Sequence, residues 1–184
     1  MIIFIVGGTK SSKSSFGEAL ANKLSNKGKL YYLATMNPSD CEDLKRINEH
    51  IENRKEYGFT TIEQNRDLHN IIDKFNSEDT VLLDSVTSLA SNEMFVGTEF
   101  NEDISLKISE DIKNLSKRVK NIVLVSDYIF SDGIIYDSYT ERFRRELGHI
   151  NCNIAAMADI VFESSFGSLI IHKGEELAKD EKFI

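Results

Sequence analysis

Short apolar runs alternate along this chain with longer stretches in which apolar residues recur every three or four positions. Seven runs predict β-strands, at residues 2–6, 30–34, 59–62, 81–84, 122–125, 160–163 and 169–173. The runs at 81–84 and 122–125 are almost wholly apolar, which is typical of strands covered on both faces. The stretches 104–119 and 139–154 keep one face apolar at helical spacing, and so predict amphipathic helices.

This alternation predicts an α/β fold in which helices cover both faces of a mostly parallel, roughly seven-stranded sheet. Only SSFGS separates the last two runs, a connection that allows nothing but a hairpin. We therefore expect the final strand to run antiparallel to its neighbour. The length of 184 residues fits one domain spanning 1–184.

The composition is acidic, with 30 Asp and Glu against 22 Lys and Arg and a net charge of -8. This balance argues against nucleic acid or an anionic membrane surface as a partner. The two cysteines, Cys41 and Cys152, lack metal or redox spacing and fit a reducing compartment. No run reaches the ~18 apolar residues of a membrane span. We therefore expect a cytoplasmic protein with no membrane span.

The segment GGTKSSKS, residues 7–14, follows the first predicted strand and nearly spells the phosphate-binding loop G-x-x-x-x-G-K-[ST]. Such a loop directs backbone N–H groups at an anion beside a helix N-terminus, and its lysine reaches the outer phosphates. The alternative is a plain helix cap in a serine-rich turn. The predicted nucleotide-binding residues in this segment are Gly7, Gly8, Thr9, Lys10, Ser11, Ser12, Lys13 and Ser14.

Ser12 stands where the loop pattern has its second glycine. Its Cβ is tolerable if the backbone φ is negative and costly if φ is positive. The helix that follows is expected to open at Ser14 and to turn Phe16, Ala19, Leu20 and Leu24 inward.

Asp84 ends the apolar strand VLLD, and Ser14 follows the loop lysine. A carboxylate at such a strand end, together with the loop hydroxyl, is the usual protein contribution to a Mg²⁺ site beside a bound nucleotide. The alternative for Asp84 is a cap of the next helix. Ser14 and Asp84 are therefore the candidate residues for Mg²⁺.

A predicted helix over 39–56 carries Arg46, His50 and Arg54 four residues apart, so that all three share one face. This stripe is either an ordinary solvated face or a surface that reads phosphate. In the second case a neutral His50 imidazole can attack phosphorus while the two guanidinium groups stabilise the charge that develops.

A second basic group, ERFRR, places Arg142, Arg144 and Arg145 on the late helix. These residues either contact a phosphate or pair with neighbouring acids such as Glu141 and Glu146. We favour the pairing.

Together these segments resemble the bifunctional adenosylcobinamide kinase / adenosylcobinamide-phosphate guanylyltransferase family of cobalamin biosynthesis. GGTKSSKS is similar to its GG-x-x-SGKS loop, YLAT to its second strand, and VLLDSVTSLASNEMF to its acidic strand end and following helix. RINEHIENR resembles the signature R-I-x-x-H-x-x-x-R, and FRRELGHINCN the helix FRD-x-x-G-x-x-NQ. The Ala-Asp pair before the sixth strand and the closing hairpin also match.

The resemblance implies a RecA-like P-loop fold, a homotrimer and two reactions. A nucleoside triphosphate, ATP or GTP, would phosphorylate the aminopropanol hydroxyl of adenosylcobinamide. The histidine of the signature, His50 by position, would then take GMP from GTP and pass it to the cobinamide phosphate. The implied catalytic residues are His50 and Lys13, and Arg46, Arg54 and Asp84 join the loop as nucleotide-binding residues.

The chain departs from the family pattern at four places: Ser12, Lys55 in place of proline, Asp127-Tyr128 in place of Asn-Glu, and Cys152 in place of glutamine. Three functions stay open at this point. They are the bifunctional enzyme, a single-activity or diverged small-molecule kinase, and a nucleotide-binding paralogue without turnover.

Overall fold

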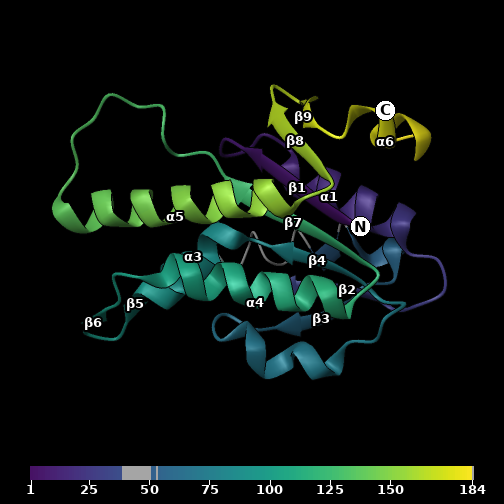
Figure 1. Cartoon of the computed structure of the whole chain (residues 1–184), viewed down its shortest axis with the longest axis horizontal. Coiled ribbons are helices and arrows are strands. Elements are labelled where there is room, and N and C mark those ends of the chain that lie inside the picture. The colour runs from purple at the N-terminus through teal and green to yellow at the C-terminus, as the bar shows by residue number, and fades with distance from the viewer. Residues whose placement is uncertain (39–50, 53, 184) are drawn as a thin grey trace.

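The computed structural model describes residues 1–38, 51–52 and 54–183 and contains one seven-stranded sheet, ordered β3-β2-β4-β7-β1-β8-β9 (Figure 1). The strands are β1 (Ile2–Gly7), β2 (Leu30–Ala34), β3 (Thr60–Glu63), β4 (Thr80–Asp84), β7 (Asn121–Asp127), β8 (Ile160–Ser165) and β9 (Ser168–Lys173). All neighbours pair in parallel except β8 and β9, which form the expected antiparallel hairpin. The predicted fold class is confirmed.

The helical elements described are α1 (Lys13–Leu24), η1 (Lys55–Tyr57), η2 (Leu68–Lys74), α3 (Val86–Met94), α4 (Ile104–Arg118), α5 (Ser138–Met157) and α6 (Glu175–Asp180). The helices predicted at 104–119 and 139–154 are therefore confirmed as α4 and α5. Most of the helix predicted over 39–56 lies outside the described residues. A hairpin of β5 (Phe95–Val96) and β6 (Glu99–Phe100) was not predicted, because two-residue strands leave no periodic pattern.

The two faces of the sheet carry separate apolar cores, because successive strand residues point to opposite sides. On β1, Phe4 packs with residues of α3, α4, α5 and η2. Ile3 and Ile5 on the same strand pack with α1 and with Ala178 of α6. The sheet is thus the middle layer of a three-layer sandwich.

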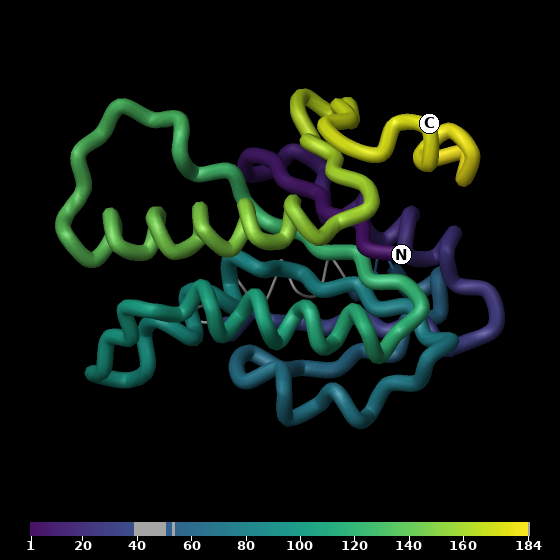
Figure 2. Tube along the Cα trace, viewed as in Figure 1, coloured from purple at the N-terminus to yellow at the C-terminus, as the bar shows by residue number. Residues whose placement is uncertain are grey.

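The connection from β7 to α5, residues 128–137, has no helix or strand and arches away from the body of the molecule (Figure 2). Sequence analysis places the end of this strand at residue 125, whereas β7 continues to Asp127. The two additional strand residues matter for the site, because they fix where Asp127 stands.

Helix α1 differs in detail from the predicted pattern. It begins at Lys13 rather than Ser14, and Ala19 is exposed rather than turned inward. Gly17 and Glu18 are buried in its place. A Cβ at Gly17 would lie 3.0 Å from both Leu82 and Val125, so the glycine lets the helix approach β4 and β7 closely. No helix among the described residues has the length and apolar character needed to cross a membrane.

Candidate nucleotide-binding and phosphoryl-transfer site

The strand register places the predicted site residues along one edge of the sheet. Gly7 at the end of β1 is level with Asp127 on β7 and with Ser164 on β8. Asp84 ends β4 and is level with Val125, two residues before Asp127. Ligands of open α/β sheets bind at this carboxyl edge. The sheet order therefore brings the phosphate loop and Asp84 together, with Asp127 between them.

The phosphate loop leaves β1 through a position where only glycine fits. A Cβ on Gly7 would lie 2.5 Å from the Ser164 carbonyl oxygen and 2.7 Å from the Ser11 hydroxyl. The Ser164 hydroxyl in turn donates a hydrogen bond to the Ser11 carbonyl, and the Ser11 N–H donates to the Gly8 carbonyl at 3.3 Å. The loop is thus tied to β8 on one side.

Ser12 has a φ of 69° and caps the N-terminus of α1 in the left-handed region. Its side chain makes no capping hydrogen bond. This answers the question that the sequence left open, because the φ is positive and the serine Cβ is strained there. Lys10, with a φ of 58°, is a second residue of the loop in this conformation.

Lys13 lies at the mouth of the loop and is largely buried. Its ammonium donates to the Gly8 carbonyl at 3.0 Å and forms an ion pair with Asp127, with 2.7 Å between Nζ and Oδ1. The lysine of the predicted motif is therefore positioned inside the loop, where a carboxylate holds it. A triphosphate would take the place of that carboxylate as its anionic partner.

Asp84 belongs to a buried polar cluster with Tyr32 and Glu18. The Tyr32 hydroxyl donates to Asp84 Oδ2 at 2.9 Å, and burial, followed by the neighbouring Asp84 charge, raises the pKa of this phenol. Burial and the Asp84 charge also raise the pKa of Glu18 to about 7. Oε1 of Glu18 is buried and has no hydrogen-bond partner among the described residues. A second acid is therefore buried close to Asp84.

The end of β4 is held firmly against β2. The Thr35 hydroxyl accepts from the Ser85 N–H and donates to the Ser85 carbonyl, both at 2.7 Å. Asn92 donates to the Thr35 carbonyl at 2.8 Å. It is Ser85, whose hydroxyl accepts from the Ser88 N–H, that caps α3. The alternative interpretation of Asp84 as that helix cap is therefore wrong.

Arg54 reaches this same cluster from the other side. Its guanidinium lies over the Tyr32 ring at 3.7 Å from the centroid, and Nη2 donates to the Thr61 hydroxyl at 3.3 Å. The Arg54 charge lowers the pKa of Glu18, against the larger effects of burial and Asp84. Arg46 and His50, the other two members of the stripe, lie outside the described residues.

Two residues of the second basic group, Arg142 and Arg144, pair with acids, as favoured from the sequence. Arg144 bonds Glu141 at 2.8 Å and lies 3.3 Å from Asp132. Arg142 pairs with Asp103 at 2.8 Å and more distantly with Glu146. These contacts hold the 128–137 connection and the start of α4 against α5.

The oxygen ligands at this edge fit Mg²⁺. Ser14 on α1 and Asp84 on β4 supply a hydroxyl and a carboxylate, and Glu18 lies one helical turn after Ser14. No cluster of three or more His, Cys, Asp or Glu able to hold a metal occurs among the residues the structure describes. Mg²⁺ keeps several waters in proteins and binds through one or two carboxylates together with substrate phosphates.

A family model described as Cobinamide kinase / cobinamide phosphate guanyltransferase, CobU, matches residues 3–170. The chain belongs to this family. It is 29% identical over 175 residues to the bifunctional adenosylcobalamin biosynthesis protein CobU of Escherichia coli (strain K12), covering 88% of this chain and 94% of the relative. The protein of the same name from Salmonella typhimurium is 27% identical over 174 residues, with the same coverage.

Among solved structures, one ATPase domain aligns with a TM-score of 0.55 and 15% identity, covering 94% of this chain and 76% of that one. At this identity the likeness concerns the fold alone. It supports the P-loop ATPase type of sheet that the sequence predicts.

Two residues of the site were not predicted from the sequence. They are Glu18, an acid close to Asp84, and Tyr32, whose hydroxyl donates to Asp84. The spacing of Glu18, four residues after Ser14, was a usable signal. The role of Tyr32 depends on the pairing of β2 with β4, which the sequence does not state.

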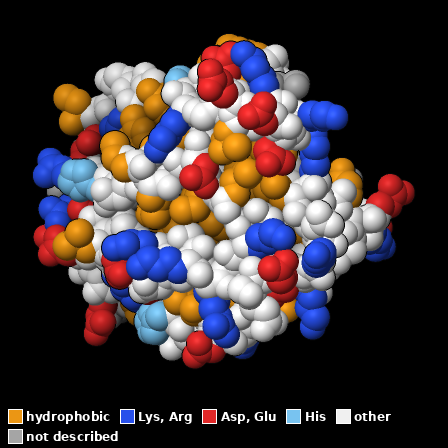
Figure 3. Space-filling view, turned by 45° about the vertical axis from the view of Figure 1, so that its right-hand side comes forward, with side chains coloured by type: hydrophobic (Ala, Val, Ile, Leu, Met, Phe, Trp, Pro, Cys, Tyr) orange, Lys and Arg blue, Asp and Glu red, His pale blue; other side chains and the backbone are white. Residues whose placement is uncertain are grey.

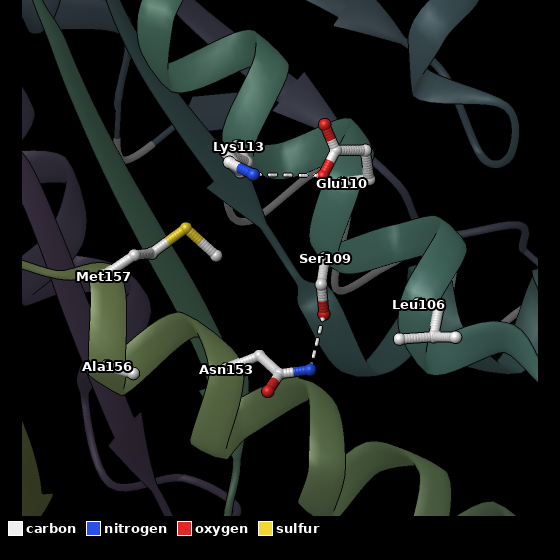
Figure 4. A pocket seen from close by; sticks show the side chains of 7 residues that line it. All are labelled: Leu106, Ser109, Glu110, Lys113, Asn153, Ala156 and Met157. Atoms are coloured by element: carbon white, nitrogen blue, oxygen red, sulfur yellow. Dashed lines mark hydrogen bonds and ion pairs between the residues drawn. The ribbon is translucent and has the colours of Figure 1, made fainter.

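A separate groove lies between α4 and α5 (Figure 4). It is lined by Leu106, Ser109, Glu110, Lys113, Asn153, Ala156 and Met157. Asn153 donates to the Ser109 hydroxyl at 3.1 Å across it, and Glu110 pairs with Lys113 on α4. Its polar groups are satisfied by one another, so the groove shows no chemistry comparable with that of the phosphate loop.

On the face drawn in Figure 3, basic and acidic side chains are interspersed rather than gathered into one basic patch. The arrangement agrees with the acidic net charge of -8.

Proposed function

We propose that this protein phosphorylates adenosylcobinamide with a nucleoside triphosphate and then transfers GMP from GTP to the cobinamide phosphate. One domain, spanning 1–184, would carry both reactions. The observation that carries the proposal is Lys13, which lies in a strand–loop–helix of the P-loop type, in a chain of the CobU family. The CobU relatives are named as bifunctional adenosylcobalamin biosynthesis proteins.

In the kinase step, the loop formed by residues 7–14 would surround the phosphates of ATP or GTP. Lys13 would turn from Asp127 to the outer phosphates and bring positive charge to the oxygens that gain negative charge. Ser14 and Asp84 would hold Mg²⁺, which neutralises the phosphate oxygens when it is bound. The aminopropanol hydroxyl of adenosylcobinamide would be the acceptor.

In the second step, His50 would attack the α-phosphorus of GTP. A bond from an imidazole nitrogen to phosphorus forms, the bond to the bridging oxygen breaks, and pyrophosphate leaves. The cobinamide phosphate then takes GMP from the histidine. Arg46 and Arg54 would stabilise the charge on the transferring group. Arg54 is 6% exposed and packs on the Tyr32 ring. Its guanidinium would therefore have to move away from that ring, at least in part, to contact the transferring group.

The decisive experiment follows two labels. GTP labelled at the α-phosphorus and mixed with the protein and Mg²⁺ should leave label on the protein, as a phosphoramidate stable in base and lost in mild acid. GTP labelled at the γ-phosphorus should pass label to added adenosylcobinamide. His50→Ala should abolish the first result and leave nucleotide binding largely intact. His149→Ala, which removes an exposed histidine of α5, is the matched control.

The outcomes separate the functions that stay open. Transfer of γ-label without label on the protein favours a single-activity kinase. Nucleotide binding with neither label transferred favours a paralogue without turnover. Labelling of His50→Ala at the wild-type level would refute the assigned nucleophile. The homotrimer implied by the family is likewise a proposal, which sedimentation equilibrium tests.

A further inference from the structure

Asp127 lies beside the loop lysine at the carboxyl edge of the sheet. It is the last residue of β7, and β7 lies between β1, which leads into the phosphate loop, and β4, which ends in Asp84. Its carboxylate touches Lys13, the residue that reaches the outer phosphates in such loops. The topology thus places Asp127 between the loop lysine and the acid on the Mg²⁺ side.

Three elements fix the backbone around Asp127. Its N–H donates to the Thr87 hydroxyl of α3 at 2.8 Å, and its carbonyl accepts a long hydrogen bond from Asn151 of α5 at 3.5 Å. The next N–H, that of Tyr128, donates to the Gly7 carbonyl at 2.8 Å. The side chain itself is 26% exposed. A rigidly held carboxylate that a substrate can still reach is what proton transfer requires.

The other acids near the loop do not meet this requirement. Glu18 is 3% exposed, so a substrate hydroxyl cannot reach it. Asp84 accepts from the Tyr32 hydroxyl and is the candidate residue for Mg²⁺. Asp127 is therefore the carboxylate at this edge that is both held and accessible among the residues described.

The position of this carboxylate also differs from the family pattern quoted above, which has Asn-Glu where this chain has Asp127-Tyr128. The pattern places its carboxylate on the second residue, and this chain places it on the first. A carboxylate is kept at the end of the same strand, one residue earlier and on a shorter side chain.

We infer that Asp127 accepts the proton of the hydroxyl that attacks the γ-phosphorus, an inference that rests on the proposed kinase function. The substrate oxygen forms a bond to the γ-phosphorus, and the bond from that phosphorus to the β–γ bridging oxygen breaks. The nucleoside diphosphate leaves with that electron pair. The hydroxyl proton passes to the Asp127 carboxylate and from there to solvent.

The ion pair with Lys13 fits this role before a nucleotide binds. Lys13 Nζ lies 2.7 Å from Asp127 Oδ1, so the side chain has a cationic partner beside the loop. When phosphates draw the lysine toward them, Asp127 loses part of its partner and gains an acceptor site for a hydroxyl. The lysine, lying between the phosphates and Asp127, also reduces the repulsion between the two anions.

The test is Asp127→Asn, a change of nearly the same shape that cannot take up the proton. We expect the single-turnover rate of γ-phosphoryl transfer to adenosylcobinamide to fall by roughly 10²-fold or more. We expect GTP affinity, measured by calorimetry, to stay equal or to tighten, because Lys13 no longer has to leave a carboxylate. Labelling of His50 from α-labelled GTP should be unchanged.

Asp127→Glu should restore part of the transfer rate, which a merely structural role for the residue would not explain. Asp73→Asn, at an exposed acid of η2, is the matched control and should transfer at the wild-type rate. Transfer by Asp127→Asn at the wild-type rate overturns the inference, and so does a loss of GTP affinity that accounts for the whole defect. A wild-type protein that binds GTP and transfers no phosphoryl group refutes the kinase function itself, which is a distinguishable result.

Discussion

Two carboxylates flank the phosphate loop at the same sheet edge, and their surroundings are opposite. Asp127 has a positive partner in Lys13 at 2.7 Å. Asp84 has a hydroxyl from Tyr32 and a second acid, Glu18, whose pKa is raised to about 7. One side of the site is therefore an acid–lysine pair, whereas the other brings two acids together, with the Arg54 guanidinium over the Tyr32 ring.

The difference indicates that one edge of the sheet can serve two tasks. We propose that the Asp84 side, where two acids lie together, takes the divalent cation. On the Asp127 side, a lysine that moved to a phosphate would leave a carboxylate whose side chain is 26% exposed and therefore reaches solvent. Changing either side separately should reveal this division.

The largest effect is expected from Lys13→Ala. It removes the buried cation of the phosphate loop that pairs with Asp127, so that a triphosphate meets a carboxylate without its partner. We expect nucleotide affinity to fall by about 2–4 kcal/mol, or roughly 30- to 1000-fold. Calorimetric titration with GTP and ATP measures this. Equal affinities for wild type and variant would show that the loop does not bind the phosphates.

Glu18→Gln should change the pH dependence of stability on the Asp84 side. The folded protein holds the Glu18 proton up to a pKa of about 7, above the ordinary value of 4.5. Between these values the folded state binds more protons than the unfolded state, so the free energy of unfolding falls as pH rises. The variant has no such slope, and above pH 7 it should be more stable than wild type.

After allowance for solvent screening, we expect this gain to be on the order of 2 kcal/mol. Urea unfolding at pH 5 and pH 8, with chelator present, is the measurement. Glu63→Gln, at an exposed acid that ends β3, should retain the wild-type slope. Parallel pH profiles for wild type and Glu18→Gln would contradict the prediction.

Ser12→Gly should relieve backbone strain in the phosphate loop, next to Lys13. With φ at 69°, the serine Cβ is strained, and glycine adopts this conformation freely. We expect about 1 kcal/mol of relief, seen as tighter GTP binding or a higher melting temperature. Ser12→Ala keeps the Cβ and should show no gain. Weaker binding by the glycine variant would instead indicate that the hydroxyl contacts phosphate.

The smallest effect is expected from Tyr32→Phe, which removes the hydroxyl that donates to Asp84 at 2.9 Å. The aromatic ring that packs under Arg54 is kept. A lost hydrogen bond of this kind costs about 1 kcal/mol or less in stability. Chemical unfolding measures it, with Tyr57→Phe at an exposed tyrosine as control. A cost equal to that of the control would mean that the Tyr32 hydroxyl does not stabilise Asp84.

The sequence by itself determined the fold class and the phosphate loop. Periodicity predicted the strands and helices because burial on two faces of a sheet demands apolar runs, and SSFGS was short enough to force the final hairpin. The loop was readable because its lysine and hydroxyl must follow a strand and open a helix. The β5–β6 hairpin was not predicted, because strands of two residues are defined only by their pairing with each other.

The tertiary structure alone decided which acids surround the loop. The positive φ of Ser12 is a property of the folded backbone, and the sequence was compatible with either a negative or a positive φ. The closeness of Asp127 to Lys13 depends on β7 lying beside β1, and that of Tyr32 to Asp84 on β2 lying beside β4. These contacts join residues that are far apart along the chain, and strand order, which local patterning does not encode, brings them together.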